Sequence, residues 1–179
     1  MIFIGFGFLM TFIKTMSWTA LSYNWIISIW ALQWGIIFND FWHQVIGGKD
    51  LVKVDVTLQT LIIGDFGAGA AMITFGVLLG KANLQQLLFL IFWQMLWWGL
   101  NLAIGEMAIK GMDTGGSIFV HSFGAYFGLA ASFFFQPDRA RVSNNLKDSY
   151  QSNTVAMIGS IFLWIYWPSF NSALTTGNT

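Results

Sequence analysis

The 179-residue sequence contains no cysteine and few charged residues. Without cysteine, the chain has neither a disulfide framework nor a Cys-based zinc site. Charged residues make up only 9% of the chain, whereas soluble domains usually carry about 25%, so an ordinary water-facing surface is excluded. Eight basic residues balance eight acidic ones, which leaves no basic patch for nucleic acid and no acidic tail.

The sequence consists mainly of long hydrophobic segments. Hydrophobic residues make up 56% of the chain, and the 10 Trp and 18 Phe are typical of helices that meet lipid headgroups. All apolar segments but the first reach roughly the 20 residues that a helix needs to cross a membrane. The segments cover residues 1–13, 18–38, 57–80, 84–104, 115–135 and 155–174. None shows the alternation of strands. The sequence predicts an all-α integral membrane protein, a bundle of transmembrane helices in one partial domain over residues 1–179.

The polar links between these segments indicate which helix ends share a side of the membrane. If every segment spans, links one, three and five share a side, and we expect that side to be cytoplasmic because it holds the larger number of basic residues. Those residues are Lys14, Lys81, Arg139, Arg141 and Lys147. We expect a solvated loop over residues 136–153 and an outer loop over residues 40–55. The chain begins and ends close to apolar runs, so we expect it to be part of a longer protein.

Polar side chains inside apolar segments are costly and usually face a bundle interior or a pathway. Asp65, Asp113 and His121 are the candidates, whereas His43 and Glu106 lie at segment ends, where we interpret them as solvated side chains without a special role. Asp65 precedes a Gly/Ala-rich run that predicts close helix packing, and it could cap a local irregularity there.

His121 lies on a predicted polar stripe from Asp113 to Gly128, in which residues recur every three or four positions. Gly124 and Gly128 would let a neighbouring helix approach closely. Two interpretations stay open. Either Asp113 caps the helix start and His121 bonds across a helix interface, or His121 lines a narrow route, where imidazole can both donate and accept. In the last segment, Pro168 predicts a kink.

Four stretches in the same order resemble one family. Residues 112–129, MDTGGSIFVHSFGAYFGL, resemble the signature of Rh glycoproteins, which belong to the ammonium transporter superfamily. The other three are GFGFLMTF at residues 5–12, the Asp65–Phe66 pair, and FLWIYWPSFNSA at residues 162–173. The resemblance covers essentially the whole chain. It implies about half of an 11–12-helix channel fold built from two inverted repeats.

The resemblance also implies a function. Family members are homotrimers in the plasma membrane, each subunit with its own hydrophobic pore for ammonia or ammonium and for methylammonium, without cofactor, metal or enzymatic activity. By motif, His121 resembles the first pore histidine, and Phe66 and Phe170 resemble two stacked gate phenylalanines. Asp113 resembles the acid that supports ammonium deprotonation or holds the local backbone. Further pore or vestibule positions are Phe6, Asp65, Ile73, Leu129 and Asn171.

The chain departs from the family pattern at several positions. The second pore histidine is absent, and His43 in a polar link does not take its place. The family often has acids where this chain has Leu102 and Asn153, which predicts weaker attraction of cations at the mouths. The alternative function is a non-transporting structural subunit. A membrane enzyme that uses His121 and Asp113 is disfavoured, because no nucleophile or metal-ligand cluster accompanies them.

Overall fold

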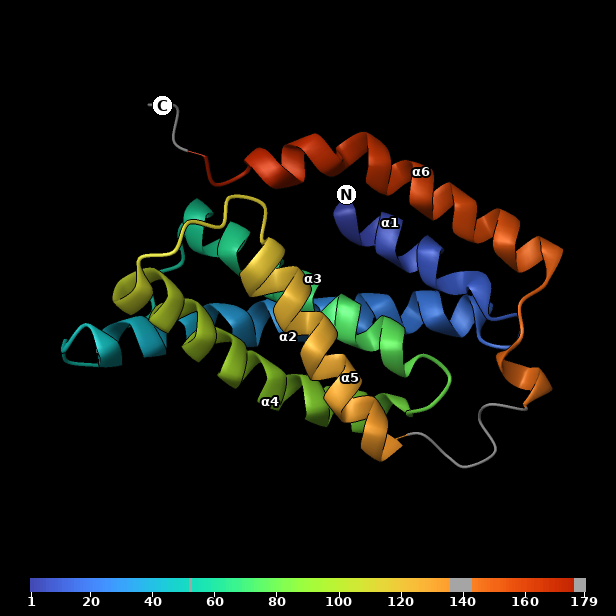
Figure 1. Ribbon diagram of the computed structural model, residues 1–179, viewed down its shortest axis with the longest axis horizontal. Coiled ribbons are helices and arrows are strands. Elements are labelled where there is room, and N and C mark those ends of the chain that lie inside the picture. Colours follow the sequence, from blue (N-terminus) through green and yellow to red (C-terminus); the bar gives the residue numbers. More distant parts are fainter. Residues whose placement is uncertain (52, 136–142, 176–179) are drawn as a thin grey trace.

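The computed structural model describes residues 1–51, 53–135 and 143–175, and it is helical almost throughout (Figure 1). No strand occurs within these residues, in agreement with the all-α prediction. A π-helical segment follows α4 and another precedes α5. The elements are α1 (Ile2–Leu9), the 3₁₀ turn η1 (Met10–Phe12), α2 (Ser17–Ile46), α3 (Leu58–Leu78), α4 (Leu84–Ala103), the π-helical η2 (Ile104–Ile109) and η3 (Ser117–Ser122), α5 (Phe123–Phe135), the 3₁₀ turn η5 (Asn144–Leu146) and α6 (Tyr150–Ser172).

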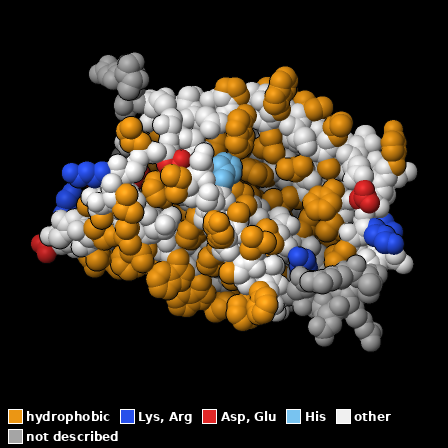
Figure 2. All heavy atoms as spheres, viewed as in Figure 1, with side chains coloured by type: hydrophobic (Ala, Val, Ile, Leu, Met, Phe, Trp, Pro, Cys, Tyr) orange, Lys and Arg blue, Asp and Glu red, His pale blue; other side chains and the backbone are white. Residues whose placement is uncertain are grey.

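The arrangement of the helices leaves a broad apolar face. α2 lies against α3 and α4, α3 also lies against α5, and α1 lies against α6 (Figure 1). Within the described residues, four helices are long and apolar enough to cross a membrane: Ser17–Ile46, Leu58–Leu78, Leu84–Ile109 and Ser117–Phe135. Figure 2 shows hydrophobic side chains across the middle of one face and most charged side chains toward its two ends. This distribution suits helices that cross a hydrocarbon layer.

Small residues bring α3 into close contact with two neighbouring helices. A Cβ added to Gly67 would lie 2.8 Å from the ring of Trp98 on α4. On the other side, a Cβ on Gly124 of α5 would lie 2.6 Å from the carbonyl oxygen of Ala70. Thr74 donates a 3.0 Å hydrogen bond to the Gly124 carbonyl. The predicted close approach at Gly124 is therefore confirmed, with α3 as the partner helix.

α2 extends further than the sequence predicted. It ends at Ile46 rather than near residue 38, because polar side chains in its last turns bond within the helix. His43 Nδ1 lies 2.7 Å from the Asn39 carbonyl oxygen, and Gln44 Nε2 donates to Asp40 over 2.6 Å. The prediction that the second link begins at residue 40 is therefore wrong.

α6 begins at Tyr150, before its predicted start near residue 155. Ser149 and Ser152 form a capping box, in which each hydroxyl accepts from the backbone amide of the other. The Ser152 hydroxyl also lies 2.7 Å from the Phe12 carbonyl oxygen, to which it can donate. The start of α6 is thus set by its own cap and by the end of η1.

Links one, three and five meet at one end of the bundle. The Lys14 amide donates to the Lys147 carbonyl over 3.1 Å, so links one and five are in contact. Leu146 lies against Gly80 in link three. The three links therefore share a side, and the cytoplasmic assignment of that side stays a prediction. That assignment rests on five basic residues, and two of them, Arg139 and Arg141, lie outside the described residues.

The contact between α1 and α6 gives a test of the packing. A Cβ on Gly159 would overlap the backbone nitrogen of Leu9 and lie 2.6 Å from the Gly5 carbonyl oxygen. Because backbone atoms cannot rotate away, we expect Gly159→Ala to push the helices apart and to destabilise the protein by about 1–3 kcal/mol. Thermal unfolding in detergent, followed by tryptophan fluorescence, measures the change.

The matched control is Gly69→Ala, whose nearest new neighbour would be Val120 Cγ1 at an ordinary 3.5 Å. We expect this variant to unfold near the parent midpoint. Equal midpoints for Gly159→Ala and the parent would contradict the close α1–α6 contact.

Candidate functional site

The segment between η2 and α5 is organised around the carboxylate of Asp113. Its Oδ2 atom accepts hydrogen bonds from the backbone amides of Ile118 and Phe119, each 2.8 Å long. Amides in a first helical turn lack partners within the helix, and a carboxylate is favoured there. Gly116 begins the segment at φ 75°, a left-handed conformation that glycine adopts without steric cost. Asp113 thus caps η3, as one of the two interpretations from sequence predicted.

The π-helical turn of η3 changes the predicted polar stripe. The His121 amide donates to the carbonyl of Gly116, five residues earlier, over 2.8 Å, whereas an α-helix uses the residue four earlier. Asp113 lies before the helical segment begins. The prediction that one α-helical face runs from Asp113 through His121 to Gly128 is therefore wrong before residue 123. Such π-helical turns occur frequently at functional sites.

His121 lies within a group of aromatic side chains from α3 and α6. The Phe66 and Phe170 rings meet edge to face, with centroids 4.7 Å apart and an interplanar angle of 87°, instead of stacking face to face. The imidazole is centred 6.0 Å from the Phe170 ring and 5.4 Å from the Trp167 ring. Trp167 stacks on Phe170 at 5.1 Å and 18°. The structure therefore brings together the two proposed gate residues and the proposed pore histidine.

The imidazole of His121 offers a polar atom in otherwise apolar surroundings. Its Nε2 atom is buried and has no hydrogen-bond partner within the described residues. Phe66 and Phe170 beside it are buried as well. Such a nitrogen can donate to or accept from a small molecule, depending on its protonation. A bare cation entering these surroundings would lose several kcal/mol of hydration, whereas a small neutral molecule would lose far less.

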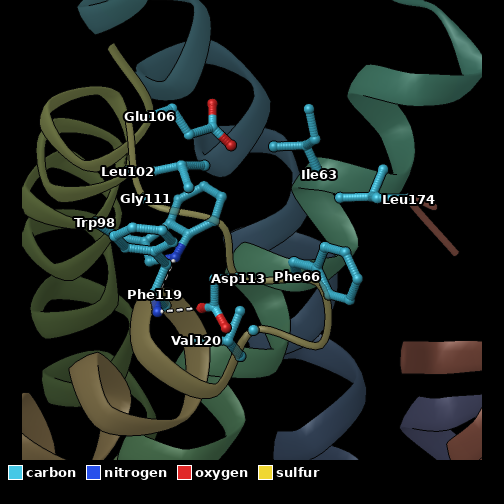
Figure 3. Close-up of a pocket in the computed structure, with 11 residues that line it drawn as sticks. Ile63, Phe66, Trp98, Leu102, Glu106, Gly111, Asp113, Phe119, Val120 and Leu174 are labelled. Atoms are coloured by element: carbon cyan, nitrogen blue, oxygen red, sulfur yellow. Dashed lines mark hydrogen bonds between the residues drawn. The ribbon is translucent and has the colours of Figure 1, made fainter. Parts of the chain in front are cut away.

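Two pockets border the contact between Phe66 and Phe170. One, of about 60 Å³, has Phe66 in its wall together with the side chains of Glu106 and Asp113 (Figure 3). The other, of about 180 Å³, is lined by Asp65, Phe66 and Phe170. A water molecule needs only about 10–15 Å³ by this kind of measure, so each pocket can hold a molecule the size of ammonia.

The structure also places four further candidates from the sequence. Phe6 is buried in the hydrophobic core. Ile73 faces α5, where a Cβ on Gly124 would lie 3.1 Å from the Ile73 Cβ. Leu129, on α5, is 58% exposed. Asp65 lies within an unbroken helix, so the prediction that it caps a local irregularity is wrong, and its side chain lines the larger pocket instead.

The proline-containing end of α6 carries the remaining candidate, Asn171. The helix continues through Pro168, whose missing amide leaves one backbone carbonyl without its usual partner. Asn171 Nδ2 donates to the Trp167 carbonyl over 2.8 Å, whereas the carbonyl that lacks its partner belongs to Trp164, four residues before the proline. The Asn171 side chain also fills the space beside Gly115, where a Cβ would overlap it.

Two residues that the sequence assigned to solvated segment ends are bonded to each other. His43 Nε2 lies 3.0 Å from Glu106 Oε2, and this contact joins the end of α2 to η2. Glu106 also lines the smaller pocket. Both side chains stay partly exposed, at 27% and 47%, as predicted for segment ends, but the mutual contact was not predicted. The residues are 63 positions apart in the chain, so no local pattern could show the contact.

Trp98 and Trp167 belong to the site although sequence reasoning gave them no role. Trp98 is fully buried and donates from Nε1 to the Phe119 carbonyl over 3.0 Å, which joins α4 to η3. Trp167 precedes Phe170 by three residues, and this spacing places both on one helix face. That spacing was a usable signal, whereas nothing near Trp98 in the sequence indicates its partner.

The chain is similar to known membrane proteins over its whole length. The model of the Ammonium Transporter Family matches residues 1–179. The chain is 41% identical over 177 residues to ammonium transporter Rh type B of Oryctolagus cuniculus. It is also 41% identical over 176 residues to ammonium transporter Rh type B of Xenopus tropicalis. These alignments cover 98% of this chain, but only 38% and 37% of the relatives.

The fold is similar to that of a solved structure. Rh50 of Nitrosomonas europaea, described as one of the Rhesus protein family of channels, matches with a TM-score of 0.83 at 26% sequence identity. The match covers 98% of this chain and 46% of that one. The chain therefore spans less than half the length of the proteins that it resembles.

Replacement of Asp113 tests its role as a cap. Asp113→Ala leaves the amides of Ile118 and Phe119 without their acceptor, and the loss of a hydrogen bond to a charged group costs about 1.5–3 kcal/mol. Asp113→Asn keeps an oxygen acceptor in place, so we expect a smaller loss. Thermal unfolding in detergent should rank the parent above Asn and Asn above Ala. An Ala variant as stable as the parent would contradict the cap.

Proposed function

The chain belongs to the Ammonium Transporter Family and is an integral, multi-pass membrane protein, and on that premise we propose that it forms part of a channel for ammonia or ammonium. The observation that carries the proposal is the His121 imidazole, whose buried Nε2 lies without a partner beside Phe170 and Trp167. The names of the relatives and of the matching structure support the same activity. Because the chain spans less than half of those proteins, the activity is proposed for the whole protein.

The contact between Phe66 and Phe170 would serve as the gate of this pore. Their centroids are 4.7 Å apart, so the rings are in van der Waals contact and no molecule fits between them. Passage therefore requires one ring to turn. Aromatic faces attract ammonium through cation–π contact worth roughly 0.5–2 kcal/mol. This attraction favours the cation in the pockets that Phe66 borders, before it passes the gate.

The cation would lose its proton before it reaches His121. A charge in an apolar pore costs several kcal/mol, whereas neutral ammonia crosses with little penalty and can bond to the imidazole in passing. A proton would be regained on the far side. Asp113 supports this route by holding the backbone, because its Oδ2 already accepts from two amides. Further pore or vestibule positions in this proposal are Phe6, Asp65, Ile73, Leu129 and Asn171.

The apolar surface of the chain supports the proposed surroundings. Phe134 and Trp164 are 84% and 80% exposed, so they need lipid or other protein segments around them. We infer a homotrimer in the plasma membrane, as the family resemblance implies, and methylammonium as a further substrate. The alternative, a non-transporting structural subunit, would not require Phe66, Phe170 and His121 to be grouped around one pore.

Vesicles that contain the full-length protein test conduction through this site. We expect an ammonia gradient to raise the internal pH faster than in protein-free vesicles, measured by stopped flow. His121→Ala and Phe170→Ala are expected to change this rate severalfold, because one removes the imidazole and the other removes a gate ring. Tyr150→Phe is the control, since Tyr150 is exposed at the opposite end of α6.

A rate equal to that of protein-free vesicles, from folded parent protein, would reject the channel and favour the structural subunit. Conduction that neither substitution changes would place the pore elsewhere in the protein.

A further inference from the structure

The hydrogen-bond geometry of His43 and Glu106 requires an additional proton. A neutral imidazole and an ionised carboxylate together carry one proton too few for it. His43 Nδ1 lies 2.7 Å from the carbonyl oxygen of Asn39, which only accepts, so Nδ1 carries a hydrogen. Glu106 Oε2, 3.0 Å from His43 Nε2, is also only an acceptor when ionised. A neutral imidazole would thus place two lone pairs against each other. Either His43 is an imidazolium or Glu106 is a carboxylic acid.

The pair lies at an end of the bundle where water and protons have access. α2 has 30 residues and is about 45 Å long, whereas the hydrocarbon layer is about 30 Å thick. His43 lies in the last turn of this helix. The side chains of His43 and Glu106 keep 27% and 47% of their surfaces exposed. The pair is therefore open to titration from the surrounding solution.

Glu106 also forms one end of the smaller pocket. Figure 3 shows its carboxylate at one end of the group of lining side chains, with Asp113 toward the other end and Phe66 on the side. The same acid thus has two possible partners, the imidazole of His43 and whatever occupies the pocket. Its bond to His43 decides how much of its negative charge is available to the pocket.

We propose that His43 and Glu106 share a proton that controls this carboxylate. While the proton is held, Glu106 stays bonded to His43 and joins α2 to η2. When the proton is lost and the remaining imidazole hydrogen stays on Nδ1 against the Asn39 carbonyl, Nε2 and the ionised carboxylate repel each other and Glu106 is free to turn into the pocket. There it attracts a small monovalent cation, for which ammonium is the candidate. The identity of the cation rests on the proposed function, whereas the shared proton does not.

Of the other charged groups near the pair, some favour retention of the shared proton and one opposes it. Asp40 on α2 acts on His43 through its charge, and Asp113 faces Glu106 across the pocket. Both favour retention of the shared proton, because a negative charge stabilises a nearby positive one. Lys110, which ends η2, opposes it. The pair is therefore expected to respond to ionic strength as well as to pH.

Nuclear magnetic resonance of ¹³C-labelled histidine tests the shared proton in the full-length protein in lipid nanodiscs. His43→Gln identifies the signal of His43 by its loss. We expect Glu106→Gln to shift the loss of the His43 proton to lower pH, because the carboxylate that stabilises the imidazolium is gone. Asp50→Asn removes a negative charge from the same end of the bundle without touching the pair, and should titrate like the parent. Identical titrations in Glu106→Gln and the parent would overturn the shared proton.

The same signal tests the competing cation. Ammonium chloride, compared with sodium chloride at equal ionic strength, should shift the loss of the His43 proton to lower pH in the parent, because ammonium binds the released carboxylate. The shift should be absent in Glu106→Gln. Equal titrations of the parent in both salts would overturn the cation site.

Neither titration measures ammonia transport, so the outcome for the shared proton can be distinguished from the outcome for the proposed function. Protein that conducts no ammonia but shows the Glu106-dependent titration would reject the proposed function and support the shared proton.

Discussion

Asp113 accepts hydrogen bonds from two backbone amides of η3 through the same carboxylate oxygen. One of these amides belongs to Phe119, whose carbonyl accepts from the buried Trp98, and Trp98 in turn packs on Gly67. A chain of contacts thus runs from α3 through α4 to η3. An unpaired polar group away from water costs several kcal/mol, so these bonds restrict the backbone strongly. The position of His121, two residues after Phe119, follows from this restriction.

The composition and the lengths of apolar segments were sufficient to predict helices and a membrane, because both depend on local sequence alone. The residues at which helices end were harder to predict. α2 continues beyond residue 38 because polar side chains such as Gln44 bond within the helix, which hydrophobicity does not report. The π-helical turn of η3 depends on Asp113 and on the left-handed Gly116 together. The motif around His121 named candidate residues, but it gave no distances such as the 6.0 Å that separates the His121 and Phe170 rings.

The smaller pocket shows why comparison of single positions can mislead. By the family resemblance, Leu102 stands at a position that is often acidic, and this departure predicted weaker attraction of cations. Glu106, one helical turn later, lines the same pocket as Leu102. Both side chains line one pocket, so a carboxylate can stand at another position along the chain and still face the same space. The expectation of weaker attraction therefore does not follow from Leu102 alone.

The surroundings of Phe66 and Phe170, the two proposed gate rings, differ in how far they would hinder rotation of each ring. Phe170 is held on one face by the stacked Trp167 and approached by the imidazole of His121. Phe66 borders both of the pockets described above, so free space lies on two sides of its ring. Rotation of Phe170 would break an aromatic stack with Trp167 worth about 0.5–1.5 kcal/mol, whereas rotation of Phe66 would break its edge-to-face contact with Phe170 and the packing of a ring that is 7% exposed. If these rings form the proposed gate, we infer that Phe66 turns more readily, because free space borders it on two sides while Trp167 is stacked on Phe170.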